Sequence, residues 1–288
     1  MRPKAIPPIL DGIVLILDRP RDAMNVGGVV RAMGNFGLGR LRLVEPAAYD
    51  VDRIHSMAHR GGPVLDRIER YPSLEAALAD CGYVLGTSAR ARAVRHERLS
   101  PRQAAPALLR AAALGAAAPD VPSESTLSPV SPVVPPVVPP VAVLFGPEDR
   151  GLSNEALGRC NAVITIPTAP DDSSLNLAQS ALLIAYEMWL AAIEDATPDT
   201  RRGRAPDVAA AVEATDAAAR EPLASGHARD EMFAALEEVL WGMHPNNDAG
   251  RVAHTLARLR AVLLRAAPRT EETRMLTRFF IHIARERK

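Results

Sequence analysis

Short apolar runs alternate with helical patterns over the first two-thirds of the chain. Five runs have the length and β-branched content of buried strands, at 13–17, 41–44, 83–86, 141–145 and 162–166. Pro167 closes the last run, because proline cannot donate to a sheet ladder. Apolar residues at helical spacing predict helices between the strands, at 26–36, 54–59, 74–79, 154–158 and 177–189. This alternation is typical of an α/β domain with a parallel sheet.

The last third of the chain carries only helical patterns. Apolar stripes that begin near 227, 250 and 270 predict three helices. A Pro-Val repeat over 122–140 should be extended and solvated. We therefore predict an α/β domain over 1–195 with a Pro-rich surface insertion near 115–140, a linker over 196–226, and an all-α module over 227–288.

The overall charge does not indicate a nucleic-acid partner, because the formal net charge is zero. Among the 34 Lys and Arg residues, only Lys4 and Lys288 are lysines. Arginine suits phosphate recognition, but a GC-rich genome also favours arginine codons. The loop 90–98 is either a phosphate-contacting patch or a solvated basic loop. From Arg251 onward ten basic residues stand against three acidic ones, which favours RNA contact by the helical module over an ordinary solvated cap.

The sequence carries no pattern of an export or membrane segment. Residues 1–10 contain three prolines and no apolar core, unlike a secretory signal, and no apolar run has the length of a membrane span. Cys81 and Cys160 lack metal-ligand or CxxC spacing, so we expect buried thiols and no metal site. These features predict a cytoplasmic protein with no membrane partner.

Polar loops follow two of the predicted strands. The loop 146–151 follows the strand 141–145, and the loop 168–176 follows the strand 162–166. Because the carboxyl ends of parallel strands share one edge of the sheet, where ligands bind, the two loops predict a site there. Taken singly, the glycines of the first loop only make a turn, and the second loop only caps a helix through Asp172, Ser173 or Ser174.

A third polar loop leads into the helix 26–36. Asn25 is the expected cap of this helix, and Gly27 and Gly28 would let another chain or a ligand approach closely. Most arginines are simply solvated, but Arg31 lies on a largely apolar helix. We therefore expect Arg31 to have a partner.

These loops carry three ordered motifs that resemble those of the SPOUT superfamily. Asn25 to Arg31 resembles motif one, 144–152 (LFGPEDRGL) resembles motif two, and 166–177 resembles motif three. The closest resemblance is to RNA 2′-O-ribose methyltransferases of the TrmH/TrmJ type, in the TrmJ branch, which also has a helical C-terminal extension. One departure is Pro147, where the branch often has a basic residue. The resemblance covers most of 13–192.

The resemblance implies a parallel-sheet SPOUT domain with a C-terminal trefoil knot, a homodimer, and S-adenosyl-L-methionine as the cofactor, without a metal. The residues that it assigns to the cofactor pocket lie in loops after three strands: Thr87, Ser88, Ala89, Gly146, Ile166, Ser173, Ser174 and Leu175. The residues that it assigns to catalysis lie in the three motifs: Asn25, Arg31, Glu148, Ser174 and Asn176.

In the family, the counterpart of Arg31 acts beside the cofactor of the partner subunit. It either removes the ribose proton or orients the hydroxyl. Because a guanidinium has a pKa above roughly 12, the favoured role is to position the ribose hydroxyl and an adjacent phosphate. Ser174 and Asn176 would orient Arg31 or the ribose, and Glu148 would pair with an arginine across the motif.

The implied function is methylation of ribose 2′-hydroxyls in RNA. The branch implies a tRNA substrate, with a cytidine or uridine at the start of the anticodon loop. Ribosomal RNA is the alternative substrate, and a catalytically inactive RNA-binding SPOUT protein is the alternative function. A nicotinamide-dependent Rossmann enzyme is disfavoured, because no G-x-G-x-x-G follows a predicted strand.

Overall fold

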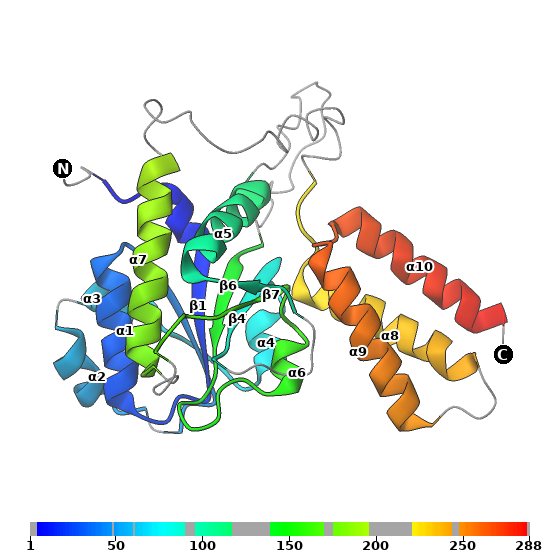
Figure 1. The fold of residues 1–288 in the computed structure, drawn as a ribbon, viewed down its shortest axis with the longest axis horizontal. Helices are drawn as coiled ribbons and strands as arrows, with labels where there is room; N and C mark the ends of the chain where they lie inside the picture. Colours follow the sequence, from blue (N-terminus) through cyan, green and yellow to red (C-terminus); the bar gives the residue numbers. More distant parts are fainter. Residues whose placement is uncertain are drawn as a thin grey trace, which may run out of the picture.

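A seven-stranded parallel sheet forms the centre of the molecule in the computed structural model (Figure 1). The structure describes residues 5–47, 49–59, 61–89, 96–116, 139–169, 175–195, 221–243 and 248–286. The strands follow the order β3-β2-β1-β6-β4-β7-β5 across the sheet. Their bounds are β1 Ile13–Asp18, β2 Arg40–Val44, β3 Glu69–Tyr71, β4 Tyr83–Thr87, β5 Arg98–Leu99, β6 Val141–Phe145 and β7 Ala162–Ile164. The parallel α/β sheet predicted from the alternating pattern is confirmed.

The five apolar runs all form strands, and β1, β2, β4 and β6 agree with their predicted bounds to within one residue. The prediction for the fifth run was too long, because β7 ends at Ile164 rather than Ile166. Strands β3 and β5 were not predicted. Each is short and carries charged residues, so neither produces an apolar run.

Helices cover both faces of the sheet. The first part of the chain contributes η1 Pro8–Gly12, α1 Ala23–Asn35, α2 Val51–Ala58, α3 Gly62–Leu65 and α4 Leu74–Leu78. After β5 come α5 Pro101–Ala116, α6 Asn154–Leu157 and α7 Leu177–Asp195. The helices α1, α5 and α7 cover one face, and α4 and α6 cover the other. The helix α5 was not predicted, although its buried alanines and leucines pack on the sheet.

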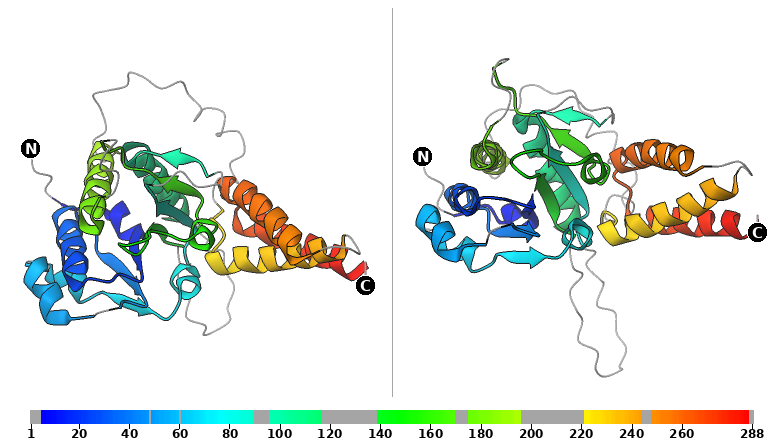
Figure 2. Two further views of the ribbon diagram at one scale, coloured as in Figure 1. Left: turned by 60° about the horizontal axis from the view of Figure 1, so that its bottom comes forward. Right: turned by 90° about the horizontal axis from the view of Figure 1, so that it is seen from below.

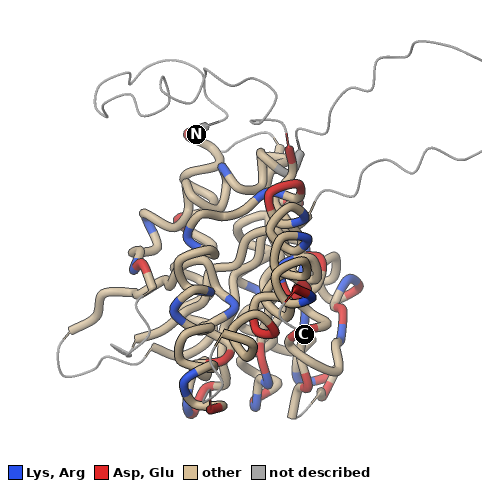
Figure 3. The backbone as a smooth tube through the Cα atoms, turned by 90° about the vertical axis from the view of Figure 1, so that its right-hand side faces the viewer, with Lys and Arg blue, Asp and Glu red and all other residues tan. Residues whose placement is uncertain are grey.

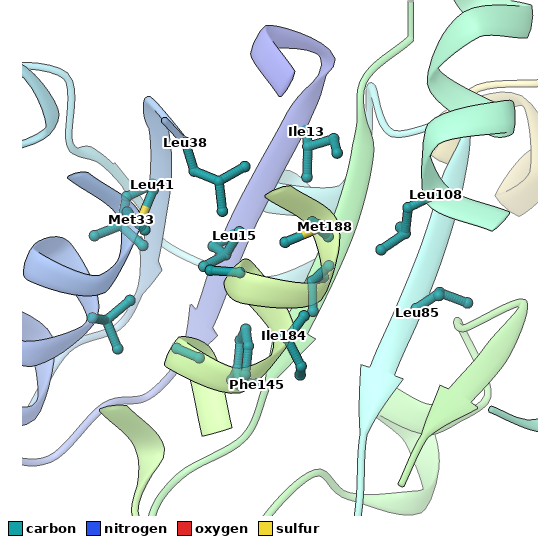
Figure 4. Packing of buried hydrophobic residues seen from close by; sticks show 14 of the residues in the cluster. Ile13, Leu15, Met33, Leu38, Leu41, Leu85, Leu108, Phe145, Ile184 and Met188 are labelled. Carbon is teal, nitrogen blue, oxygen red and sulfur yellow. The ribbon is translucent and has the colours of Figure 1, made fainter. Parts of the chain in front are cut away.

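The strand β1 shows how the two faces of the sheet differ. Ile13, Leu15 and Leu17 belong to the larger core with α1 and α7, whereas Val14 and Ile16 belong to the smaller core with α4 and α6. This period of two follows from the alternation of side chains along a strand. Figure 4 shows the larger core, where Ile184 and Met188 of α7 lie over the strands. Because both faces are covered, the strand is a continuous apolar run.

The helix α7 is long and apolar enough to cross a membrane by length and composition, the one such helix among the described residues. It packs against α1 and α5, and Ala181, Ile184, Ala185 and Met188 lie in the core. On its other side, Leu182, Leu183 and Tyr186 are exposed. The helix α7 therefore packs as a core helix with one apolar face uncovered.

Three helices form the C-terminal module, as the stripes predicted. They are α8 Gly226–Gly242, α9 Ala249–Arg265 and α10 Thr270–Glu286. Met232, Phe233 and Leu236 lie in a small core of this module that is separate from the cores of the sheet. Both views in Figure 2 show the module beside the α/β domain.

The predicted linker and insertion lie mainly outside the described residues. These are 196–220 of the linker and 117–138 of the Pro-rich stretch. The prediction that the linker extends to residue 226 was wrong, because Leu223 is buried in the larger core and Gly226 already begins α8. The module is therefore joined to the α/β domain by packing that begins before its first helix.

Candidate active site

The loops after β4, β6 and β7 surround a cavity of about 430 Å³. This cavity lies at the carboxyl ends of the strands, where the order of the parallel sheet predicts a ligand site. Six of the eight predicted pocket residues line it: Thr87, Ser88, Ala89, Gly146, Ile166 and Leu175. The other two, Ser173 and Ser174, lie outside the described residues.

The turn after β6 requires glycine at its first position. A Cβ added to Gly146 would lie 2.3 Å from the backbone nitrogen of Leu152. The turn closes when Gly151, with φ +63°, donates its N–H to the Pro147 carbonyl at 2.8 Å. Gly151 thus adopts a left-handed conformation that favours glycine. The turn places the side chain of Glu148 beside the start of α1.

Glu148 accepts hydrogen bonds from Asn25 of motif one and from the two residues before α1. Its Oε2 accepts from the Arg21 N–H at 2.9 Å, and its Oε1 accepts from the Asn25 side-chain amide at 3.0 Å and the Asp22 N–H at 3.3 Å. Among the described residues, Glu148 forms no ion pair with the arginine side chain that we expected. The ion pair between the two loops joins Arg21 to Asp149 instead. No pattern in the sequence marks Arg21 as a site residue, because its role depends on how the two loops meet.

Asn176 connects motif three to the same network. Its side-chain nitrogen donates to Asn25 Oδ1 at 2.8 Å, and its Oδ1 accepts from the Ala178 N–H at 2.8 Å. Gln179 Oε1 in turn accepts from the Asn176 N–H at 3.2 Å, which completes a capping box at the start of α7. Asn176 therefore caps α7, whereas the predicted caps Asp172, Ser173 and Ser174 lie outside the described residues.

The prediction that Asn25 caps the first helix was also wrong. α1 begins at Ala23, and Asp22 caps it by accepting from the Met24 N–H at 2.9 Å. The side chain of Asn25 is thereby free to bridge Glu148 and Asn176. Three motifs that lie far apart in the chain thus meet in one hydrogen-bonded chain at the mouth of the cavity.

A family model described as the SpoU rRNA Methylase family matches residues 12–186. The chain belongs to this family. It is 31% identical to a tRNA (cytidine/uridine-2′-O-)-methyltransferase TrmJ of Klebsiella pneumoniae, over 97% of this chain and 99% of that one. It is 34% identical to a Pseudomonas aeruginosa TrmJ named as a tRNA (cytidine/uridine/adenosine-2′-O-)-methyltransferase, over 64% of each chain. The crystal structure of TrmJ from Z. mobilis ZM4 superposes with a TM-score of 0.67 at 27% identity, over 94% of this chain and 98% of that one.

In this family member, the partner expected for Arg31 does not lie among the described residues. Its side chain is exposed on α1 and makes no hydrogen bond or ion pair within the described part of the chain. The glycines before it serve packing inside the chain. A Cβ on Gly27 would lie 2.7 Å from the Ile54 carbonyl oxygen of α2, and one on Gly28 would lie 2.7 Å from Ala178 Cβ of α7. Arg31 is therefore held, with its side chain exposed, on a tightly packed helix.

The strand ends around the cavity are tied to one another. Thr87 Oγ1 donates to the Leu144 carbonyl of β6 at 3.2 Å, and the Ser88 N–H donates to the Ile164 carbonyl of β7 at 3.0 Å. Thr165 Oγ1 donates back to the Ser88 carbonyl at 3.1 Å. These bonds hold the three loops in one arrangement. The cavity is therefore built from backbone and small side chains on fixed strand ends.

No group of three or more His, Cys, Asp or Glu side chains within the described ranges could hold a metal ion. Cys81 and Cys160 are free and buried, as their spacing predicted. Burial raises the pKa of each thiol to about 12. Both cysteines pack in the smaller core, away from the cavity lining.

Proposed function

We propose that this protein is an S-adenosyl-L-methionine-dependent tRNA 2′-O-methyltransferase that acts on a cytidine or uridine at the start of the anticodon loop. The observation that carries the proposal is the hydrogen-bonded chain of Asn25, Glu148 and Asn176 at the mouth of the cavity. Membership of the methylase family supports the reaction. Similarity to TrmJ over nearly the whole chain, including the helical module, supports tRNA rather than ribosomal RNA.

The cavity suits the proposed cofactor. Its volume of about 430 Å³ falls in the usual range for small-molecule sites, roughly 300–1,000 Å³. Ile166 and Leu175 offer apolar contacts to an adenine ring, and the loop backbone at Gly146 offers hydrogen-bonding groups. When bound, S-adenosyl-L-methionine supplies an electrophilic methyl group. The remaining work of the protein is to align the ribose hydroxyl and to exclude water.

Arg31 is the proposed positioning group for the ribose. Its exposed guanidinium has five donors in a planar fork, which suits a phosphate and an adjacent hydroxyl. Because a guanidinium retains its proton in proteins, orienting the hydroxyl is the role that its chemistry supports. Ser174 is proposed to contribute beside Asn176.

A homodimer would complete this site. The exposed apolar side chains of α7, Leu182, Leu183 and Tyr186, adjoin α1, and Phe36 at the end of α1 contacts Tyr186 edge to face. A second copy on this face would bury apolar surface and bring its own cavity toward Arg31. We also propose the C-terminal trefoil knot of the superfamily and a cytoplasmic location.

The helical module is the proposed second contact with RNA. Its charge is polarised, since α8 has one arginine against four acidic residues and α9 has four arginines and no acidic residue. Arg251, Arg258 and Arg265 are exposed and seven residues apart, so they lie along one side of α9. Figure 3 views the molecule from the side of this module and marks its charged residues. A row of arginines suits successive phosphates.

Methyl transfer from labelled S-adenosyl-L-methionine to unmodified RNA tests the proposal. We expect label in tRNA transcripts with a pyrimidine at the start of the anticodon loop, and loss of label when the 2′-hydroxyl there is replaced by hydrogen. Label in ribosomal RNA alone would contradict the tRNA proposal. No transfer to either RNA, with the cofactor bound, would favour an inactive RNA-binding protein.

A further inference from the structure

A buried arginine joins the helical module to the α/β domain. Arg229 of α8 is 4% exposed, and its guanidinium donates to the carbonyls of Cys81 at 2.9 Å and Gly82 at 3.2 Å. It also donates to Asn161 Oδ1 at 3.4 Å. Burial lowers the pKa of this guanidinium, so the buried charge depends on these three acceptors. The acceptors all belong to the α/β domain, and the donor belongs to the module.

Asn161 makes the reciprocal contact. It is 2% exposed, lies directly before β7, and donates from its side-chain nitrogen to the Leu264 carbonyl in the last turn of α9 at 2.7 Å. Its Oδ1 accepts from the Val84 N–H of β4 at 2.8 Å. A single buried amide therefore ties α9 to two adjacent strands. Buried polar groups with this many fixed partners hold one arrangement.

Further contacts surround this pair. The His227 N–H donates to the Ala79 carbonyl at 2.8 Å, and a Cβ on Gly226 would lie 2.2 Å from the Leu78 carbonyl oxygen. At the rim, Arg159 of the α/β domain pairs with Asp230 of α8 at 2.9 Å. We call Arg229, Asn161 and these neighbours the joint. The joint fixes the module by shape as well as by hydrogen bonds.

The joint and the cavity lie at opposite ends of the same two strands. Val84 and Asn161 stand at the amino ends of β4 and β7, and Thr87 and Ile164 at their carboxyl ends line the cavity. Three residues of extended chain span about 10 Å. Because β4 and β7 pair with each other in the sheet, this short path is rigid. The position of α9 relative to the cavity is therefore set by the strands.

We propose that Arg229 and Asn161 are positioning residues for the RNA substrate. They hold the arginine row of α9 at a fixed place relative to the cavity, so that one RNA engages both. The proposal rests on the proposed function, in that tRNA is the substrate. The module then binds RNA as a fixed part of the enzyme, and its 25-residue connection at 196–220 does not set its position.

The test compares Arg229→Lys with the wild type. Lysine keeps the charge but replaces the two guanidinium nitrogens that bond the Cys81 and Gly82 carbonyls with a single ammonium nitrogen, so these hydrogen bonds lose their present geometry. We expect the KM for tRNA to rise about tenfold, while kcat at saturating tRNA and the Kd for S-adenosyl-L-methionine stay within about twofold. Hydrogen exchange at the His227 amide should become faster. Arg102→Lys, at an exposed arginine of α5 that lies outside the module and the cavity lining, is the matched control and should change none of these values.

A second variant, at the exposed rim of the joint, keeps the test valid if Arg229→Lys does not fold. Asp230→Asn removes the charge that pairs with Arg159 at the rim and, at 3.7 Å, with Arg260 of α9, at a side chain that is 41% exposed. Glu238→Gln removes one charge from the same helix without touching the joint. Only the first should raise the tRNA KM, by about threefold. Faster His227 exchange with an unchanged tRNA KM would overturn the inference, as would an equal loss of cofactor affinity. A wild type that methylates no tRNA would refute the proposed function itself.

Discussion

Two arginines of the molecule lie in contrasting environments. At the amino ends of β4 and β7, Arg229 is buried and donates to three acceptors within the chain. On α1, Arg31 is exposed and has no partner among the described residues. The two side chains have the same chemistry, so the difference lies in their surroundings. An arginine whose donors are used inside the chain holds a structure, whereas one with free donors is available to a ligand.

The polar groups of the joint and of the cavity differ in the same way. Asn161 has all its side-chain bonds inside the joint, while Glu148, Asn25 and Asn176 form a chain that borders an open cavity. The comparison predicts that changes at the cavity end affect turnover or cofactor affinity, whereas changes at the joint affect RNA affinity or stability. Four substitutions test the division, from the largest expected effect to the smallest.

The largest effect is expected for Arg31→Ala. Misplacing the reacting hydroxyl should lower kcat about 100-fold while cofactor affinity and stability stay unchanged, because the side chain is exposed. Arg31→Lys should recover little, since lysine lacks the planar fork. Single-turnover methyl transfer to tRNA is the measurement, with Arg53→Ala on α2 as the matched exposed control. A wild-type rate in Arg31→Ala would make this residue an ordinary surface arginine.

Gly146→Ala should have the next largest effect. The added Cβ would overlap the backbone of Leu152, so the turn that borders the cavity must shift. We expect a loss of about 1–3 kcal/mol in the free energy of unfolding and a weaker Kd for S-adenosyl-L-methionine. Calorimetry and denaturant titration measure the two quantities. Gly62→Ala, where the added Cβ meets nothing within 4 Å, should leave both unchanged.

Glu148→Gln should have a smaller effect on catalysis. The amide of glutamine must face the donors of Arg21 or Asn25, so at least one hydrogen bond to a charged acceptor is lost, at about 1–2 kcal/mol. We expect kcat to fall about tenfold as Asn25 and Asn176 shift. Steady-state kinetics are compared with those of Glu155→Gln, an exposed site on α6. Equal rates for the two variants would remove Glu148 from the site.

The smallest effect concerns His96 near the joint. Burial, followed by the charge of Arg265 on α9, lowers the pKa of its imidazole below 6.5. The unfolded chain therefore binds this proton more readily than the folded chain, so the contribution to stability is full above pH 6.5 and declines as the pH falls. The wild type should lose more stability between pH 7.5 and pH 5.5 than His96→Gln, as measured by urea unfolding. Identical losses would show that the protonation of His96 beside α9 does not affect stability.

The sequence predicted the positions of the strands more accurately than the contacts between elements. Apolar runs located β1, β2, β4, β6 and β7 because strands covered on both faces must be apolar throughout. The polar strands β3 and β5 gave no such signal. Six pocket residues were found because a parallel sheet brings its strand ends to one edge. The cap of α1 was missed because Asp22 and Asn25 are equally good caps by residue type.

By itself, the sequence determined the class of the fold, the three motifs and the membership of a methylase family, because these depend on local pattern and order along the chain. Only the tertiary structure decided which polar side chains meet. Asn25 reaches Glu148 and Asn176 across more than 100 residues of chain, and Arg229 reaches Cys81 and Gly82. Hydrogen bonds act over about 3 Å, so their partners depend on the packing of whole elements rather than on residue type.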